Sequence, residues 1–379
     1  MQSRGLKDKE LLTILGPVAW ARSMFVCAAC GAVRYPGDEE LDVVNTTRSP
    51  GVRRMMARAG SKDTFKEGRG DLKVYAGIDV SAKDVERVAE GIGESIEVWQ
   101  STERAVLMKS AEQEGVLHLK TIPVMYVEYD GTGVPMTKAE LVGRRGKQED
   151  GSAKTREAKL GCVFTQTTPD ADGFPIRDPN STTFVGAIET AEKCGERIYA
   201  EALRRGLHNA KQVVVLGDGA LWVRGIAEHH FPGAIQIVDL YHAREHVTDL
   251  CKLLFGANEK QVVHHRIRWW ADLDAGRVEK IADEARQKKM PTEAKQLKKV
   301  ENEIDYLHGN RDRMRYAAFR KRGLFVGSGV IEAGCGSVIG NRLKRSGMEW
   351  SERGANAVIA LRCLITSGRF EDYWESRAS

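Results

Sequence analysis

The chain has 379 residues, 42% of them hydrophobic, so it is long enough for two or three domains and can bury a full core. Lysine and arginine number 58 against 53 acidic residues, and this mild basic excess of +5 allows a nucleic-acid partner without requiring one. The seven cysteines are spread thinly and are odd in number, which argues against a disulfide framework. Because no apolar stretch approaches the roughly 18 residues of a membrane helix, the sequence predicts a soluble, cytoplasmic protein with no membrane partner.

Residues 10–35 are typical of short β structure and carry one Cys-x-x-Cys pair, Cys27 and Cys30. A structural Zn²⁺ ion takes four ligands, commonly from two such pairs, and the sequence nearby offers no second pair. The pair is therefore half of a zinc site. Zinc binding at Cys27 and Cys30 is one interpretation, and the others are a knuckle that folds by packing alone and a ribbon whose first knuckle has been lost.

Residues 49–100 are predicted to form three short helices. Ser49 stands before Pro50 as an N-cap, and Ser81 opens the last helix with a sequence similar to a capping box. An apolar stripe with helical spacing follows at Val85, Val88, Ile92 and Ile96. A helix-turn-helix element that reads DNA ends with residues 81–97 fits this pattern, and a plain helical bundle would give the same stripe.

From residue 120 the pattern becomes α/β. Apolar runs predict strands at residues 122–129, 158–165, 213–216 and 234–238, with a further strand around 170–178. Between and after them, helices are predicted over residues 182–205, 222–229 and from after His242 to about Leu254. This alternation is that of an open α/β sheet, in which ligands gather at the carboxyl ends of the strands.

Three carboxylates stand out against this background. Asp130 and Asp218 follow predicted strands, in YVEYDGTGVP and VVVLGDGALW, and Glu332 interrupts the apolar helical stretch VGSGVIEAGC. A buried Glu332 would need a metal or an arginine such as Arg342 to neutralise it. Two Mg²⁺ (or Mn²⁺) ions about 3.5–4 Å apart prefer carboxylate ligands and can promote cleavage of a phosphodiester. The pattern predicts Asp130, Asp218 and Glu332 as the catalytic metal ligands of a nuclease and strand transferase acting on DNA.

Each of these residues also has a simpler interpretation. Taken singly, Asp218 could be a helix N-cap and Asp130 a turn residue before glycine. Asp239 and His242, which follow the 234–238 run, are expected to support the site, and the alternative for His242 is a core histidine.

Basic residues are predicted to contact DNA in two kinds of setting. Residues 255–320 are predicted to form charged helices in which Arg266, Arg268 and Trp269 combine cations with a flat aromatic surface, although the tryptophans there could instead fill a core. Basic clusters elsewhere are expected to bind phosphates, and one of them follows Glu332 directly. The residues of these clusters are Arg144, Arg145, Lys147, Arg342, Lys344 and Arg345.

Five segments carry a family resemblance: YDGTGVPM, LGDGALWV, FPGAIQIVDLYHAREHV, GSGVIEAGC and NRLKRSGMEWSERGANAVIALRC. As a set they are similar to the ISKra-type insertion-sequence transposases, relatives of the Mutator-type DDE enzymes, over roughly residues 15–375. The resemblance implies an α/β fold with an RNase H-like core, a mixed sheet flanked by helices, in which Asp130, Asp218 and Glu332 are the DDE triad. Residues 239–242 resemble the C/D-x-x-H signature of Mutator-like enzymes, whereas the single cysteine pair departs from a complete zinc ribbon.

The resemblance also implies a domain order. Its parts are a partial zinc-ribbon-like β module (1–48), a helix-turn-helix-like DNA-binding region (49–118), the first part of the RNase H-like core (119–254), a helical insertion domain (255–322) and the C-terminal core helices with Glu332 (323–379). The implied protein is bacterial and nucleoid-associated. It would act as a homo-oligomer on double-stranded DNA, cutting transposon terminal inverted repeats and joining them to target DNA. Alternatives are a transposase-derived DNA-binding regulator without catalysis and an RNase H-like host nuclease.

Overall fold

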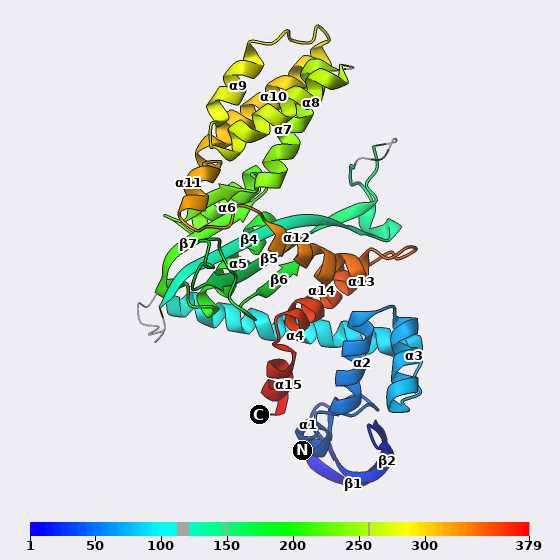
Figure 1. Cartoon of the computed structure of the whole chain (residues 1–379). Coiled ribbons are helices and arrows are strands. Elements are labelled where there is room, and N and C mark those ends of the chain that lie inside the picture. Colours follow the sequence, from blue (N-terminus) through cyan, green and yellow to red (C-terminus); the bar gives the residue numbers. More distant parts are fainter. Residues whose placement is uncertain (112–120, 147, 149–150, 257, 379) are drawn as a thin grey trace. The chain divides into compact units, whose positions relative to one another are not determined.

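The computed structural model describes residues 1–111, 121–146, 148, 151–256 and 258–378 (Figure 1). The chain folds into two compact units, each assembled from separate stretches. The first unit consists of Met1–Glu103, Gly133–Arg156 and Ser337–Ser379, and the second of Arg104–Thr132 and Glu157–Gly336. The predicted segments 49–118 and 323–379 are therefore each divided between the two units.

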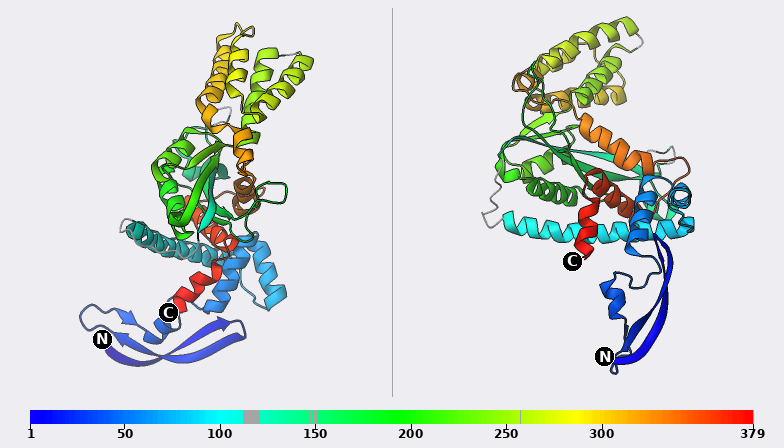
Figure 2. Two further views of the ribbon diagram at one scale, coloured as in Figure 1. Left: turned by 60° about the vertical axis from the view of Figure 1, so that its left-hand side comes forward. Right: turned by 60° about the horizontal axis from the view of Figure 1, so that its bottom comes forward.

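The first unit begins with a small antiparallel sheet. Strands β1 (Gln2–Thr13) and β2 (Gly16–Val26) form a long hairpin, and β3 (Val33–Arg34) pairs with the end of β2. Figure 2 shows the hairpin as a curved ribbon. The prediction of β structure in residues 10–35 is confirmed, but the first strand starts much earlier, because its exposed, charged first half shows no apolar alternation.

Helices make up most of the rest of the first unit. They are α1 (Pro36–Glu40), α2 (Pro50–Lys62), α3 (Phe65–Ala76), α4 (Ala82–Ala111, which continues into the second unit), the 3₁₀ helix η1 (Lys138–Leu141), α13 (Asn341–Leu343), α14 (Glu352–Thr366) and α15 (Phe370–Ala378). The predicted caps are present: Ser49 accepts a hydrogen bond from Val52 N, and Ser81 accepts one from Asp84 N at 3.0 Å.

The apolar stripe of α4 is buried within the first unit. Val85, Ile92 and Ile96 lie in two apolar clusters formed with residues of α2, α3, α14 and α15. This helix runs for 30 residues, so the 17 residues predicted as a DNA reader are only its first part. Burial of the stripe fits both interpretations of the region, a helix-turn-helix element and a simple bundle.

A five-stranded mixed sheet is the centre of the second unit. Its strands are β4 (Ile122–Pro135), β5 (Thr155–Gln166), β6 (Thr183–Ala187), β7 (Ala210–Gly217) and β8 (Ile235–Val238). Their order across the sheet is β6-β5-β4-β7-β8, with β7 parallel to β4, β8 parallel to β7, and β6 antiparallel to β5. Strands β7 and β8 thus lie on one side of β4, and β5 and β6 lie on the other.

The prediction of the third strand is wrong. Residues 170–178 form turns and no strand. The third strand of the sheet in chain order is β6, which lies where the start of the helix over residues 182–205 was predicted. Both faces of this short run are largely buried, and it pairs with β5 from Thr183 opposite Val163 to Ala187 opposite Lys159. Helix α5 (Ala191–Arg204) starts only after Thr190, whose side chain caps it. Long-range pairing therefore decides the conformation here, as is usual for short apolar runs.

The helices of the second unit flank the sheet and extend beyond it. They are α5, η2 (Leu207–Asn209), α6 (Leu221–His230), α7 (Leu240–Phe255), α8 (Glu259–Asp274), α9 (Val278–Arg286), α10 (Ala294–Asn310), η3 (Arg311–Arg313), α11 (Tyr316–Lys321) and α12 (Gly329–Gly334), after which a π-helical turn, η4 (Cys335–Gly340), begins. Helices α7 to α10 pack against one another as a bundle (Figure 1). An apolar core lies between the sheet and helices α5 and α6. None of the helices in the described residues is long and apolar enough to cross a membrane.

Candidate functional site

Asp130 and Asp218 lie at the same edge of the sheet. The parallel register pairs Glu128 of β4 with Leu216 of β7, and each aspartate comes two residues after its member of that pair. Asp130 lies within β4, which continues to Pro135, whereas Asp218 directly follows β7. Because the two strands run parallel in this register, the aspartates are placed side by side just beyond the last paired residues. Both aspartates are half-buried, so they line a sheltered edge without being sealed from solvent.

Each aspartate is held by local hydrogen bonds. Asp130 Oδ1 accepts a hydrogen bond from Gly131 N at 2.6 Å, and its Oδ2 accepts one from Cys335 Sγ at 3.8 Å. Asp218 Oδ1 accepts a bond from Ala220 N at 2.9 Å, a turn contact just before α6. The simpler interpretations as turn residues therefore describe real contacts, and they leave one oxygen of Asp218 available for other partners.

Electrostatics connect Asp130 with the other two predicted catalytic carboxylates. Burial is the main cause that raises the pKa of Asp130, and the negative charges of Asp218 and Glu332 raise it further, while the bonds from Gly131 and Cys335 lower it. The three carboxylates thus share one negative region around Asp130 of β4, which favours a positively charged partner.

Glu332 is exposed, contrary to the expectation of a buried carboxylate. It lies on α12, where Ile331 and Gly334 point inward while Glu332 faces solvent, and its Oε1 accepts a hydrogen bond from Ser328 Oγ at 3.1 Å. The sequence argument failed because the apolar neighbours of Glu332 occupy the other face of a short helix.

The carboxylates do not form a finished metal site. Within the described part of the chain, no three histidine, cysteine, aspartate or glutamate side chains lie close enough together to hold a metal ion. Like charges repel, so carboxylates with no cation between them are expected to spread apart and to bond to nearby donors. The oxygen ligands suit Mg²⁺ or Mn²⁺ in kind.

The buried carboxylate of this region is Glu128, which the sequence interpretation did not select. Glu128 has no exposed surface; its Oε2 accepts a hydrogen bond from Ile331 N at 3.0 Å, and its Oε1 has no hydrogen-bond partner. Burial raises its pKa to about 8; the bond from Ile331 opposes this, and the charges of Asp239 and Glu332 add to it. A glutamate two residues before Asp130 on the same face of an apolar strand was the available signal.

Asp239 has a structural role, because its side chain joins two segments that lie beside the site. Its Oδ1 accepts a hydrogen bond from His242 N at 2.6 Å as the N-cap of α7, and its Oδ2 accepts one from Ser328 N at 2.6 Å, just before α12. Asp239 is almost completely buried. It therefore ties the end of β8 to the segment that carries Glu332.

His242 belongs to a cluster that the sequence did not reveal. Its Nε2 lies 3.3 Å from His246 Nε2, and His246 Nδ1 lies 2.5 Å from Glu303 Oε2. The ring of Tyr306 stacks on His246, and its hydroxyl donates to the backbone oxygen of Asp218 at 2.7 Å. His246 follows His242 by one helical turn, but Glu303 and Tyr306 come from α10, about sixty residues away, so only the fold brings them together.

Arg342 is not available to DNA, and the prediction that it contacts DNA is wrong. It has no exposed surface; its Nε donates to Gly60 O at 2.9 Å, and its guanidinium lies over the rings of Phe65 and Trp350. Burial lowers its pKa to about 10. An arginine in a basic run was taken for a surface residue, whereas planar stacking allows arginine to serve inside a core.

The prediction for Trp269 is also wrong. Trp269 is fully buried in the helical bundle, and its Nε1 donates to Glu284 at 2.9 Å, as the core interpretation of the tryptophans required. Arg268 is exposed but forms an ion pair with the same Glu284. The partly exposed ring on α8 is Trp270, over which the guanidinium of Arg266 lies at 5.3 Å.

The remaining basic residues predicted to bind DNA have varied settings. Arg144, Arg145 and Lys344 are exposed. Arg345 is partly exposed and forms ion pairs with two acidic side chains of its own unit. Lys147 lies outside the described residues. Arg144, Arg145 and Lys344 thus lie on the surface, as expected for DNA contacts. Contact with DNA stays a prediction for all of these basic residues.

Cys27 and Cys30 flank a tight turn after β2. Cys27 N donates to Ala32 O at 2.8 Å, and Gly31 N donates to Cys27 O at 2.9 Å. Backbone N–H groups of Cys30 and Ala29 are the main causes that lower the pKa of the Cys27 thiol, which favours the thiolate that metals bind. Zinc binding at this pair stays a prediction, since the described residues place no further ligand beside it.

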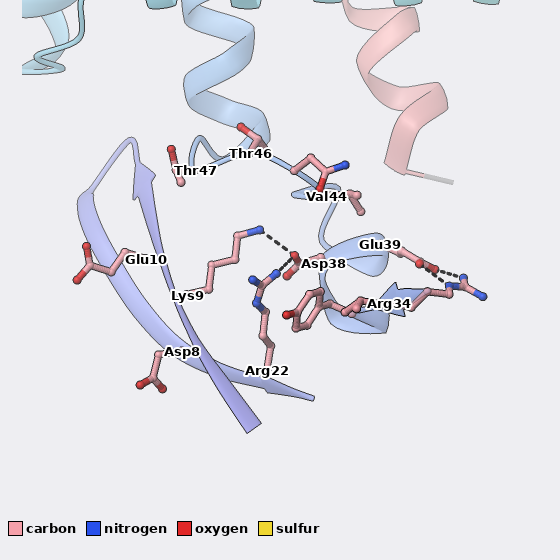
Figure 3. A pocket seen from close by; sticks show the side chains of 13 residues that line it. Asp8, Lys9, Glu10, Arg22, Arg34, Asp38, Glu39, Val44, Thr46 and Thr47 are labelled. Atoms are coloured by element: carbon pink, nitrogen blue, oxygen red, sulfur yellow. Dashed lines mark hydrogen bonds and ion pairs between the residues drawn. The ribbon is translucent and has the colours of Figure 1, made fainter. Parts of the chain in front are cut away.

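A cavity of about 670 Å³ lies in the first unit, between the β1–β2 hairpin and α1 (Figure 3). Lys9 Nζ donates to Asp38 Oδ2 at 2.9 Å, and Arg22 pairs with the same carboxylate while lying over the ring of Tyr35. These contacts join the hairpin to α1. None of the predicted catalytic residues lines this cavity.

Comparison with known proteins gives a family but no activity. A family model described as an uncharacterised protein family, UPF0236, matches residues 180–376. A relative named "UPF0236 protein in vanSb 3'region", from Streptococcus gallolyticus, is 23% identical over 337 residues, which are 86% of this chain and 66% of that protein. The chain therefore spans just under two thirds of the length of this relative.

Among solved structures, the Drosophila P element transposase strand transfer complex aligns with 91% of this chain and 84% of its own, at 10% identity and a TM-score of 0.29. A TM-score this low carries no conclusion about fold or activity. The family match, in contrast, extends over more than half of the residues, so the chain belongs to UPF0236, an uncharacterised protein family.

Proposed function

We propose that this protein is a DDE-type DNA transposase of the insertion-sequence kind, which binds transposon ends, cuts them and joins them to target DNA. One observation carries the proposal: Asp130 of β4 and Asp218 after β7 each come two residues beyond the last paired residues of these adjacent parallel strands, and the charge of Glu332 raises the pKa of Asp130. This order of acids along the chain is the one that the family resemblance implies.

The strand order supports an RNase H-like core for this unit. If β4 is counted as the first strand, the order across the sheet is 3-2-1-4-5, with strands 1, 4 and 5 parallel and strand 3 antiparallel to strand 2. In the proposed core, the acids belong on strand 1, after strand 4 and on a helix that follows strand 5. The helices α7 to α11, between β8 and Glu332, would be the insertion domain.

The carboxylates of Asp130, Asp218 and Glu332 would hold two Mg²⁺ or Mn²⁺ ions. When bound, such ions supply positive charge that activates the attacking oxygen and stabilises the leaving oxygen of a phosphodiester. The protein's own part is to fix two of the acids on a rigid sheet edge and to keep the third on a short exposed helix. Asp239 would hold that helix in place through Ser328.

The proposed partner is double-stranded DNA, bound by a homo-oligomer in the bacterial nucleoid. The exposed cations Arg144, Arg145 and Lys344 would contact phosphates, and the first part of α4 would read the terminal repeats. These assignments use the residues that the fold leaves on the surface.

A cleavage assay tests the proposal directly. The purified protein is incubated with duplex DNA that carries the terminal inverted repeats of its own element, with Mg²⁺, with Mn²⁺ or with neither. We expect strand cleavage that needs the metal, and a loss of about 100-fold or more in Asp130→Asn, Asp218→Asn and Glu332→Gln, because each change removes a charge that stabilises the transition state.

Asp305→Asn and Glu301→Gln are matched controls, since both carboxylates are exposed on α10 away from the sheet edge. End binding, followed by gel shift, should be nearly unchanged in all five variants. Metal-dependent cleavage at the normal rate by any of the three site variants would remove that residue from the proposed triad.

A second candidate is a DNA-binding regulator derived from a transposase. It predicts specific binding of the repeats with no cleavage under any metal condition, so the same assay separates the two functions.

A further inference from the structure

A chain of hydrogen bonds connects helices α7 and α10 beside the sheet edge. Glu303 Oε2 lies 2.5 Å from His246 Nδ1, and His246 Nε2 lies 3.3 Å from His242 Nε2. Glu303 and His246 are both about three quarters buried, whereas the side chain of His242 is 38% exposed. The chain therefore runs from a sheltered carboxylate to an accessible imidazole.

The chemistry of the three groups decides which nitrogen carries each proton. A carboxylate can only accept, so His246 Nδ1 must donate to Glu303. In a neutral imidazole the other nitrogen is then an acceptor, so His246 Nε2 accepts and His242 Nε2 must donate to it. Neutral His242 consequently has its lone pair on Nδ1, the atom at the far side of the ring from His246.

Tyr306 places this chain beside Asp218. Its ring stacks on His246 with centroids 3.7 Å apart, it lies 6.4 Å from the ring of His242, and its hydroxyl donates to the backbone oxygen of Asp218 at 2.7 Å. Burial raises the pKa of Tyr306 far above its usual value, so the hydroxyl stays a neutral donor. One aromatic ring thus separates the imidazoles from the strand end that carries Asp218.

Carboxylates are the charged groups that face His242. Glu245 Oε2 of α7 lies 3.6 Å from His242 Nδ1, Glu303 of α10 acts through His246, and Asp239 caps the helix at His242 N. The other neighbours, His246 and Tyr306, are an imidazole and a phenol. Among the described contacts of His242, then, every fully charged side chain is a carboxylate.

We propose that Glu303 and His246 are positioning residues that hold His242 as its Nε2–H tautomer, so that Nδ1, on the far side of the ring from the pair, is left as a proton acceptor. The chemical part of this inference rests on the proposed function. As water attacks the phosphodiester, a P–O bond forms, the bond from phosphorus to the 3′ oxygen breaks, and the proton of the attacking water passes to His242 Nδ1. The 3′ oxygen leaves and takes a proton from solvent.

The positioning can be tested without any activity. The full-length protein is labelled with ¹⁵N-histidine, and two-bond ¹H–¹⁵N spectra report the tautomer of each ring, with His242→Asn and His246→Asn used to assign the signals. We expect Nδ1–H for His246 and Nε2–H for His242. Glu303→Leu should abolish the fixed tautomer of both rings, whereas Glu301→Leu, at an exposed position of the same helix, should leave them unchanged.

The opposite tautomers in the unaltered protein, or tautomers that Glu303→Leu leaves as they were, would overturn the positioning role. The spectra of the variants also show whether each one is folded, since the signals of the remaining histidines should keep their dispersion. An unfolded Glu303→Leu is replaced by Glu303→Gln, which removes the charge but preserves the shape, and the tautomers must then lose their preference at least in part.

The proton-accepting role is tested by the pH dependence of cleavage. We expect His242→Asn to slow cleavage about 100-fold or more and to remove the acidic limb of the pH–rate profile. Glu303→Leu should slow cleavage less, because the imidazole of His242 remains but loses the hydrogen-bonded chain that fixes its tautomer. An unchanged profile in His242→Asn would overturn this role. If the unaltered protein cleaves no DNA, the proposed function fails, while the tautomer experiment still decides the positioning pair.

Discussion

Single residues of this protein show how burial, more than residue type, decides the role of a charge. Glu128 is fully buried with one oxygen lacking a partner, while Glu332, which the sequence pattern marks as buried, is exposed. An unsatisfied buried carboxylate is costly, and proteins retain such groups mainly at functional sites. Glu128 therefore keeps its proton in the folded protein at neutral pH, where an exposed glutamate would have lost it.

Because the folded protein holds the Glu128 proton so tightly, we expect its free energy of unfolding to depend on pH. The unfolded chain releases the Glu128 proton near the ordinary pKa of 4.5, whereas the folded protein holds it up to about pH 8. Below pH 4.5 both states hold the proton and there is no effect. Between pH 4.5 and about pH 8 the unfolded state binds fewer protons than the folded state. The free energy of unfolding therefore falls as pH rises in this window, by at most about 1.4 kcal/mol per pH unit.

Glu128→Gln should therefore become increasingly more stable than the unaltered protein across this pH window. Urea unfolding at several pH values, with Glu301→Gln as a control on the surface, measures the difference. A difference that stays constant with pH would show that Glu128 ionises normally in the folded state.

At the scale of elements, close helix packing depends on one glycine of α4. A Cβ atom added to Gly93 would lie 2.1 Å from Ala357 O, so α4 and α14 approach each other there without room for any side chain. Gly91 lies two residues before Gly93 and is exposed, and a Cβ atom added to it would have no heavy atom within 4 Å. The two glycines therefore separate the cost of a clash from the intrinsic preference of a helix for alanine.

The paired substitutions should move stability in opposite directions. Gly93→Ala is expected to lower the free energy of unfolding by roughly 1–3 kcal/mol or more, because α4 and α14 must move apart. Gly91→Ala should raise it by roughly 0.5–1 kcal/mol through the lower entropy of the unfolded chain. Denaturant unfolding of both variants measures this, and equal effects at the two positions would contradict the close approach.

At the scale of the whole molecule, net charge overstates the positive charge available to a partner. Arg345 and Arg268 are paired with carboxylates of their own units, and Arg342 is buried under aromatic rings. Electrostatic binding of DNA depends on the cations that reach phosphates and release counterions, not on the total of +5. Arg144 and Arg145, both exposed, are the predicted contacts best suited to test this.

Replacing Arg144 and Arg145 together by alanine should weaken DNA binding and reduce the slope of log affinity against log salt by about 2, since two phosphate contacts are lost. Fluorescence anisotropy with a labelled terminal-repeat duplex at several salt concentrations measures the slope. Lys298 and Lys299, exposed and adjacent on α10, provide the matched double control. An unchanged slope in the arginine variant would exclude these residues as phosphate contacts.

Much of the architecture could be predicted from local sequence because its signals are local. The caps at Ser49 and Ser81, the apolar runs of β4, β7 and β8, and the charged helices after residue 255 all depend on neighbouring residues. Strand β6 could not be predicted in this way, because five residues with no periodic pattern take their conformation from pairing with β5.

By itself, the sequence determined most of the element types, the parallel arrangement of the strands near Asp130 and Asp218, and the presence of these two acids beside each other on the sheet. Only the tertiary structure decided which side chains are buried and which distant ones meet: Glu128 in the core beside Ile331, and Glu303 against His246. The reason is physical. Periodicity and capping act within a few residues along the chain, whereas burial and charge interactions depend on distances in space that only the packed fold defines.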